Sequence, residues 1–276
     1  MRYGFRSFNR EWIIPDNRVI TQPNAELWKS RSDKQVYLTA FSEESPSNGP
    51  ALTLTGLVPD LHHYKGSFGG RVFPLWRDAN ANVSNVRPKL LTFLAQKLGL
   101  VSAEDIVAYL AAVAAHPAFT ARFQDDLSTP GLRIPFTADP KTFAEAVELG
   151  RTVIWLHTFG ERQTDPAKGR PAAPPRLPRP RRPNIPKAGA IPPDPAAMPD
   201  TINYDAGKKR LLIGTGYVEN VEPGVWYYEV SGSRCCCNGS ATGRKTASVP
   251  SSATAAPPRP WATSSPIIGW LNTPPN

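Results

Sequence analysis

Arginine and asparagine side chains are concentrated between residues 71 and 87, in a stretch that is otherwise rich in loop-forming residues. They are Arg71, Arg77, Asn80, Asn82, Asn85 and Arg87. Arginine and asparagine can bond in pairs to the edges of guanine and adenine, and arginine also binds phosphate. The chemistry that this span offers is therefore recognition of a nucleic acid. Each of these residues taken alone is also consistent with a solvated surface.

Two further basic groups lie in the second half of the sequence. The first is Arg176, Arg179, Arg181 and Arg182, and the second is Lys208, Lys209 and Arg210. The whole chain has 32 Lys and Arg residues against 23 Asp and Glu residues, which gives a formal net charge of +9. This balance favours a polyanionic partner.

The sequence offers no set of residues for catalysis or for metal binding. Residues 239–246 resemble a phosphate-binding loop, but the glycine spacing is wrong and no apolar strand precedes them. His62 and His63 are adjacent, so their ring nitrogens rarely reach one ion together, and we expect both in a surface loop. The three cysteines are consecutive, Cys235–Cys237, and cannot enclose a metal or form a disulfide framework.

The elements that must position these residues are centred on a helical stretch, Ser102 to Gly160. Ser102 followed by two acidic residues predicts a helix start, and His116-Pro117 ends that helix and begins the next one. Asp139-Pro140 begins a third helix. A preceding helix is predicted from Pro88 to Leu98, closed by Gly99. His116 and His157 are expected at helix ends, as partners of free carbonyl groups.

Short strands are predicted on both sides of this helical nucleus. They are Trp12–Ile14, Arg18–Ile20, Gln35–Leu38, Ala51–Leu57 and Gly70–Trp76, then Thr201–Val218 with Val225–Val230 as a small strand pair turning near Gly207. The predicted class is α+β, with a helical nucleus, short mixed β-strands on either side of it, and a disordered basic proline-rich linker and tail.

Composition divides the chain into four parts. We expect a core in 1–165, a basic linker in 166–199, a small β segment of the same domain in 200–232 and a disordered tail in 233–276. The tail has no acidic residue and no periodicity, which is also typical of a segment read out of frame. No apolar run approaches the ~20 residues of a membrane span, and no signal sequence is visible. We expect a soluble, cytoplasmic protein.

Three stretches of the sequence also resemble one known family. The helical stretch contains Ala-Tyr, His-Pro-aromatic, Arg-Phe, Asp-Asp-Leu and Leu-Arg-Ile-Pro, followed by Leu-Gly-Arg and Trp-Leu-His-Thr. Tyr3–Ile13 is similar to an aromatic–basic junction of the family, with Ser7 where proline is usual, and Gly69–Trp76 is similar to the strand before its helical region. These motifs occur over residues 2–232 in the same order as in the C-terminal target-recognition (specificity) domain of type ISP restriction–modification enzymes, and the chain resembles that domain. These enzymes are related to bacterial adenine-specific DNA methyltransferases.

The resemblance implies a DNA-recognition module severed from its methyltransferase. The parent would methylate adenine from S-adenosylmethionine, but a glycine-rich cofactor loop and an Asn/Asp-Pro-Pro-aromatic motif are both absent here. We therefore expect no catalytic residue, no metal and no cofactor in this chain. The expected partners are double-stranded DNA and the methyltransferase domain of the parent. Two alternatives stay open: a protein-interaction module using the Pro-x-x-Pro spacings of the basic span, and a nonfunctional gene remnant.

Overall fold

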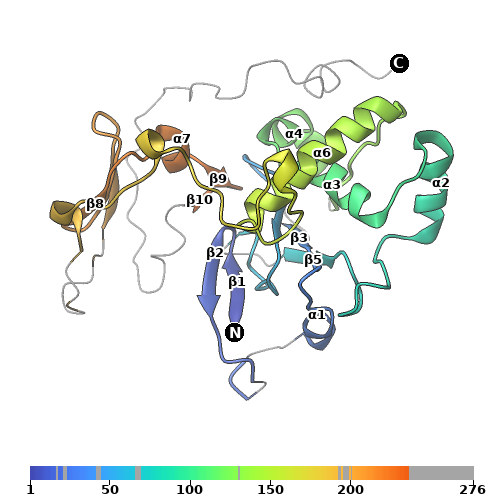
Figure 1. The fold of residues 1–276 in the computed structure, drawn as a ribbon, viewed down its shortest axis with the longest axis horizontal. Coiled ribbons are helices and arrows are strands. Elements are labelled where there is room, and N and C mark those ends of the chain that lie inside the picture. The colour runs from blue at the N-terminus through green and yellow to red at the C-terminus, as the bar shows by residue number, and fades with distance from the viewer. Residues whose placement is uncertain are drawn as a thin grey trace. The chain divides into compact units, whose positions relative to one another are not determined.

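The described residues form two compact units (Figure 1). The computed structural model describes residues 1–16, 18–20, 24–41, 45–65, 70–129, 131–191, 194, 199 and 201–235. Within these ranges the first unit comprises 1–175 and 230–233, and the second comprises 176–229 and 234–235. The tail expected to be disordered or out of frame lies, from residue 236 onward, outside the described residues. No helix of the described residues is long and apolar enough to cross a membrane.

The first unit contains a three-stranded antiparallel sheet. In it, β3 (Tyr37–Phe41) lies between β4 (Thr53–Thr55) and β5 (Gly70–Pro74). The residues of β3 and β4 are buried, whereas β5 is an edge strand whose residues alternate in exposure. Leu38 of β3 lies opposite Phe73 of β5. The strands predicted in these three segments are confirmed: β4 and β5 are shorter than predicted, and β3 begins two residues later and extends to Phe41.

A hairpin and a short helix precede this sheet. β1 (Arg2–Arg6) pairs with β2 (Asn9–Trp12). Helix α1 (Ala25–Lys29), whose first turn the Asn24 side chain caps, was not predicted, because five residues are too few to show a helical period. The strand predicted at Arg18–Ile20 is wrong, since the chain turns there. Two consecutive β-branched residues are too short a run to specify a strand.

A run of helices forms the rest of the first unit. They are α2 (Pro88–Leu98), α3 (Ala103–Ala114), α4 (Pro117–Arg122), α5 (Gln124–Leu127) and α6 (Pro140–His157). The predicted starts are confirmed: Ser102 and Asp105 form a reciprocal capping box, and Asp139 accepts hydrogen bonds from the first turn of α6. The helix predicted after Pro117 is divided at Phe123 into α4 and α5.

Helices α3 and α6 lie side by side (Figure 1), and their close contact depends on a glycine. A Cβ on Gly150 of α6 would lie 1.7 Å from the carbonyl oxygen of Ala108 in α3. Ala108, which faces Gly150, is itself fully buried. One apolar core joins these helices to Leu38 and its neighbours on the sheet. The edge strand β5 is therefore attached to a closely packed base.

The second unit contains a small antiparallel sheet. Strands β6 (Ile202–Asp205), β7 (Arg210–Ile213) and β8 (Gly216–Val218) pair in that order, and the turn predicted near Gly207 is confirmed. The strand predicted at Val225–Val230 is largely wrong. The first two residues of that predicted strand, Val225 and Trp226, are instead the last two of the short helix α7 (Pro223–Trp226). The helix begins at Pro223 because proline favours the first position of a helix. Only β9 (Glu229–Val230) remains, paired with β10 (Ser233–Arg234).

The described part of the basic proline-rich span is more ordered than the sequence indicates. It contains three short 3-10 helices, η1 (Pro166–Lys168) in the first unit and η2 (Arg179–Arg181) and η3 (Lys187–Gly189) in the second. Asn184 exchanges backbone hydrogen bonds of 3.1 and 2.8 Å with Glu219. Proline content predicts extended chain but not the partners that a neighbouring segment supplies. The α+β class itself is confirmed, whereas the domain boundaries stay a prediction.

Three histidines of the first unit take part in hydrogen bonds through Nδ1. His63 is only 2% exposed, so the surface position predicted for it is wrong, and its Nδ1 lies 2.9 Å from the Thr39 hydroxyl. His157 lies at the end of α6 as predicted, but its Nδ1 accepts a hydrogen bond from the Leu54 amide at 3.3 Å. His116 likewise accepts from a helix-start amide. Burial lowers the pKa of His63 to about 3 and that of His157 to about 4.

We expect the free energy of unfolding to fall as the pH is lowered from 7 to 5. His63 and His157 stay neutral in the folded protein over this range, whereas in the unfolded chain they take up protons near pH 6.5. The unfolded state therefore binds more protons, and each histidine lowers stability by about 2 kcal/mol at pH 5. Denaturant titrations at both pH values measure the loss. In His157→Asn, whose amide oxygen replaces the acceptor, we expect roughly half the difference. Equal stability of the wild type at both pH values would contradict this prediction.

Candidate nucleic-acid interface

Residues 75–86, which follow β5, form a braced loop that we call the reading loop. Its two sides pair, with the Arg77 amide bonded to the Val83 carbonyl at 2.8 Å. At its tip the Asp78 carboxylate accepts hydrogen bonds from the amides of Asn82 and Val83, at 3.1 and 2.8 Å. These backbone bonds, the one from Val83 above all, lower the pKa of Asp78. A polar segment thus acquires a fixed conformation without a core of its own.

The polar residues predicted to bind DNA in this region are exposed and unpaired. They are Arg71 on β5, Arg77, Asn80, Asn82 and Asn85 on the reading loop, and Arg87 directly after it. None of these side chains forms an ion pair or donates a hydrogen bond to another residue in the part of the chain that the structure describes. The Asp78 carboxylate is occupied by backbone amides rather than by these arginines. Their hydrogen-bonding capacity is therefore available to a ligand.

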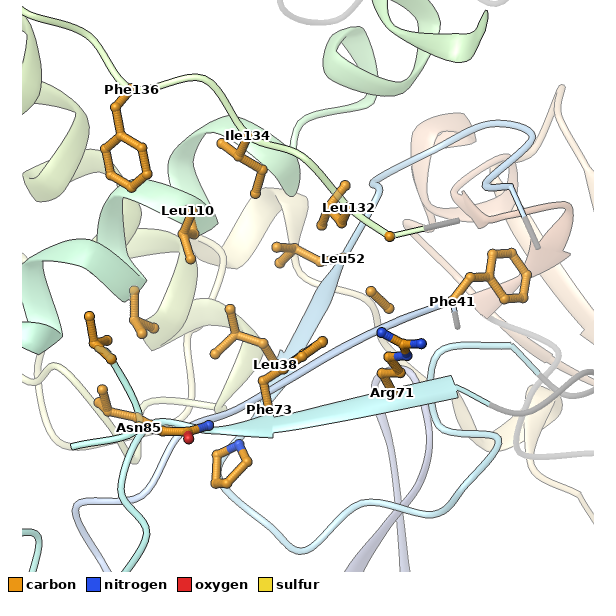
Figure 2. A pocket seen from close by; sticks show the side chains of 16 residues that line it. Leu38, Phe41, Leu52, Arg71, Phe73, Asn85, Leu110, Leu132, Ile134 and Phe136 are labelled. Carbon is orange, nitrogen blue, oxygen red and sulfur yellow. The ribbon is translucent and has the colours of Figure 1, made fainter. Parts of the chain in front are cut away.

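A largely apolar recess of about 510 Å³ lies beside the reading loop, and residues 131–136 contribute to its wall. Arg71 and Asn85 both line this apolar recess, and Figure 2 shows them on either side of Phe73. Arg71 and Phe73 share one face of β5 because the side chains of a strand alternate. The structure thus brings two of the predicted residues, one on β5 and one on the reading loop, to one surface with an aromatic ring between them.

Phe73 is not among the residues predicted from the sequence, and its side chain is 45% exposed although it lies on a strand. A phenylalanine in an apolar strand is ordinarily a core residue, so its residue type predicts a buried side chain. The signal that could have found it is the alternation of Arg71, Val72 and Phe73, which places the arginine and the ring on the same face. An exposed ring beside an arginine can contact the flat face or the methyl group of a base.

The basic residues of the second unit fall into two kinds. Those of the Lys208–Arg210 triplet are ion-paired: Lys208 with Asp205 at 4.0 Å, Lys209 with Glu222 at 3.0 Å and Arg210 with Glu219 at 2.6 Å. In contrast, Arg176, Arg179, Arg181 and Arg182 are exposed, and none of them forms an ion pair with a described residue. Among the described residues, the Arg182 side chain donates only to the carbonyl of Leu177. The arginine group is therefore better placed than the triplet to bind a polyanion.

These features define a class of site. Guanidinium and amide groups stand on a braced loop beside an apolar recess, and such groups bond to bases and phosphates. Within the described ranges, histidine, cysteine and acidic side chains nowhere gather in a group of three that could hold a metal ion. The arrangement has the chemistry that a nucleic-acid-binding surface requires.

The family model for the Type ISP C-terminal specificity domain matches residues 1–245. This match spans most of the chain, and the chain belongs to that family. The resemblance seen in the sequence is therefore confirmed, and with it DNA target recognition as the function of the family's specificity domain. A search of curated protein sequences found no match.

Two solved structures share the fold. One is a cryo-electron-microscopy structure of DrdV with DNA, with a TM-score of 0.59 and 19% identity, covering 84% of this chain and 22% of that one. The other is a nuclease-deletion mutant of the Type ISP restriction–modification enzyme LlaGI with a DNA substrate mimic, with a TM-score of 0.55 and 16% identity, covering 85% of this chain and 19% of that one. The chain thus spans about a fifth of the length of the proteins that it resembles.

Proposed function

We propose that this chain recognises the DNA target of a Type ISP restriction–modification enzyme, and that β5 and the reading loop carry out the reading of bases. The observation that carries the proposal is the set of exposed, unpaired arginine and asparagine side chains on the braced loop of a chain in the specificity-domain family. The two solved structures described above both contain DNA, which supports DNA as the partner.

The side chains suit different bases. Arg71, Arg77 and Arg87 can each bond in pairs to O6 and N7 of guanine, whereas an asparagine can bond in pairs to N6 and N7 of adenine. Phe73 offers an apolar contact for the methyl group of thymine. Because the Asp78 brace fixes the loop before DNA arrives, little conformational entropy is lost on binding.

Methylation belongs, in this proposal, to another part of the parent protein. S-adenosylmethionine would bind to the parent's methyltransferase domain, which would be a partner of this chain, since the motifs that hold the cofactor and the target base are absent from the sequence. The chain itself would supply sequence reading and grip on the DNA backbone.

The experiment that tests DNA binding is a measurement of affinity for duplex DNA over a range of salt concentrations. A protein that neutralises phosphates shows a linear fall of log affinity against log salt, with a slope of about −0.9 for each phosphate contact. We expect a clear slope for the wild-type chain. Absence of binding at low salt by folded protein would contradict the proposal.

We expect the arginines of the proline-rich span to account for part of that slope. In a variant with Arg176, Arg179, Arg181 and Arg182 all replaced by alanine, the slope should become shallower by up to about 3.6, because each true phosphate contact accounts for about 0.9. The matched control removes the ion-paired triplet, by replacing Lys208, Lys209 and Arg210 with alanine, and should change the slope less. An unchanged slope in the first variant means that this span makes no phosphate contact.

A further inference from the structure

A second hollow of the first unit, of about 630 Å³, lies at the tip of the reading loop. Ala79 and Asn80 at the tip of the loop line it, whereas the ends of the loop line the apolar recess. The remaining lining comes from the start of β1, from residues 31–34 and 56–58, and from Arg162. We call this hollow the basic cleft. The reading loop therefore separates an apolar surface from a charged one.

Charge distinguishes the basic cleft. Four basic side chains line it, those of Arg2, Arg31, Lys34 and Arg162, against one carboxylate, that of Asp33. None of the four forms an ion pair with a described residue. An anion that enters the cleft therefore gains attraction without displacing an acidic partner from the basic groups, and in a partly enclosed hollow this attraction is screened less than on an open surface.

Arg162 fixes the shape of the cleft. Its Nε donates to the carbonyl of Gln35 at 2.9 Å, and its Nη2 donates to those of Ser32 and Gly56, both at 3.1 Å. These bonds tie the segment before β3 to the turn after β4. Because most of its donors are used in this way, Arg162 supplies charge and rigidity, and the direct contacts to a ligand fall to other residues.

The groups available for direct contact are Arg31 and Lys34. Arg31 and Lys34 are exposed at the mouth of the cleft. The Ser32 hydroxyl is buried and has no hydrogen-bond partner among the described residues, a condition that a buried hydroxyl normally avoids. The guanidinium and ammonium donors at this hollow match the oxygens of a phosphate group.

We propose that the basic cleft holds a backbone phosphate of the DNA whose bases the reading loop contacts. This inference rests on the proposed function. Asn80 in the cleft and Asn85 at the apolar recess are five residues apart, so at most roughly 17 Å of chain separates them. The major groove of DNA is about 12 Å wide. The loop is therefore long enough to cross the major groove once, with one backbone phosphate bound in the cleft at its tip and base edges contacted near its ends.

The test is a double variant, Arg31→Ala with Lys34→Ala. We expect its affinity for every duplex to fall by a similar factor, its salt slope to become shallower by about 0.9 to 1.8, and its preference among sequences to stay unchanged. The charge-preserving variant Arg31→Lys with Lys34→Arg should retain most of the slope. A matched control, Lys97→Ala with Arg122→Ala, removes the same charge from exposed positions outside both hollows and should alter the slope less.

Three results would overturn the inference, provided that wild-type protein binds DNA. The first is an unchanged slope in the Arg31/Lys34 double variant, and the second is an equal change in the Lys97/Arg122 control. The third is binding of inorganic phosphate by the wild-type protein, lost in the double variant, that leaves the affinity for DNA unchanged at constant ionic strength, which would show a site for free phosphate. Failure of wild-type protein itself to prefer any sequence would contradict the proposed function instead.

Discussion

A variant with Asn80, Asn82 and Asn85 all replaced by alanine is expected to keep its affinity for arbitrary DNA while losing its preference for a target sequence. Each good paired contact to a base contributes about 1–3 kcal/mol of discrimination, so loss of two such contacts lowers the ratio of specific to nonspecific affinity by at least about 30-fold. The backbone brace on Asp78 does not use these side chains, so the loop should keep its conformation.

Competition binding between a target duplex and a scrambled duplex measures this ratio. The matched control is Asn203→Ala, because Asn203 is also an exposed asparagine but lies on β6 of the second unit. The control should retain the wild-type ratio. An unchanged ratio in the triple variant would show that bases are read elsewhere, and an equal fall for both duplexes would show that the asparagines contact only the backbone.

Replacement of Gly150 with alanine is expected to destabilise the first unit by more than ~3 kcal/mol. The added methyl group would lie 1.7 Å from the Ala108 carbonyl oxygen and 2.4 Å from its carbon, so helices α3 and α6 must move apart. Overpacking of a core costs about 1–3 kcal/mol when side chains can adjust, and here the obstacle is backbone. Chemical denaturation measures the loss.

The control for this prediction is Gly224→Ala in α7. A Cβ at Gly224 meets nothing within 4 Å, and alanine favours helices, so stability should stay the same or rise slightly. A free energy of unfolding for Gly150→Ala within about 0.5 kcal/mol of the wild type would mean that the two helices are not packed as closely as described.

Local signals predicted the helices well. Ser102 with Asp105, Asp139 with Pro140, and Pro88 with Gly99 are start and stop signals that act through neighbouring backbone groups, and each gives its boundary in the structure. The strand β5 could also be predicted, because its apolar and aromatic residues suit a sheet.

Features that depend on distant partners could not be predicted in this way. His63 is buried because Thr39 of β3, 24 positions away in the sequence, faces its ring. The proline-rich span is ordered in part because Glu219 bonds to Asn184 across a long separation. The same limit applies to the candidate site: the reading-loop residues are close in sequence and were found, whereas Arg31 and Lys34 become part of a basic cleft only through folding.

Selection of binders from a pool of random-sequence duplexes by the purified wild-type chain would show whether the chain reads sequence. We expect successive rounds to enrich one short motif, and the variant lacking Asn80, Asn82 and Asn85 to retain DNA without enriching that motif. If the duplexes selected by the wild-type protein stay as random in sequence as the starting pool, although the protein is folded and binds DNA, target recognition by this chain is contradicted.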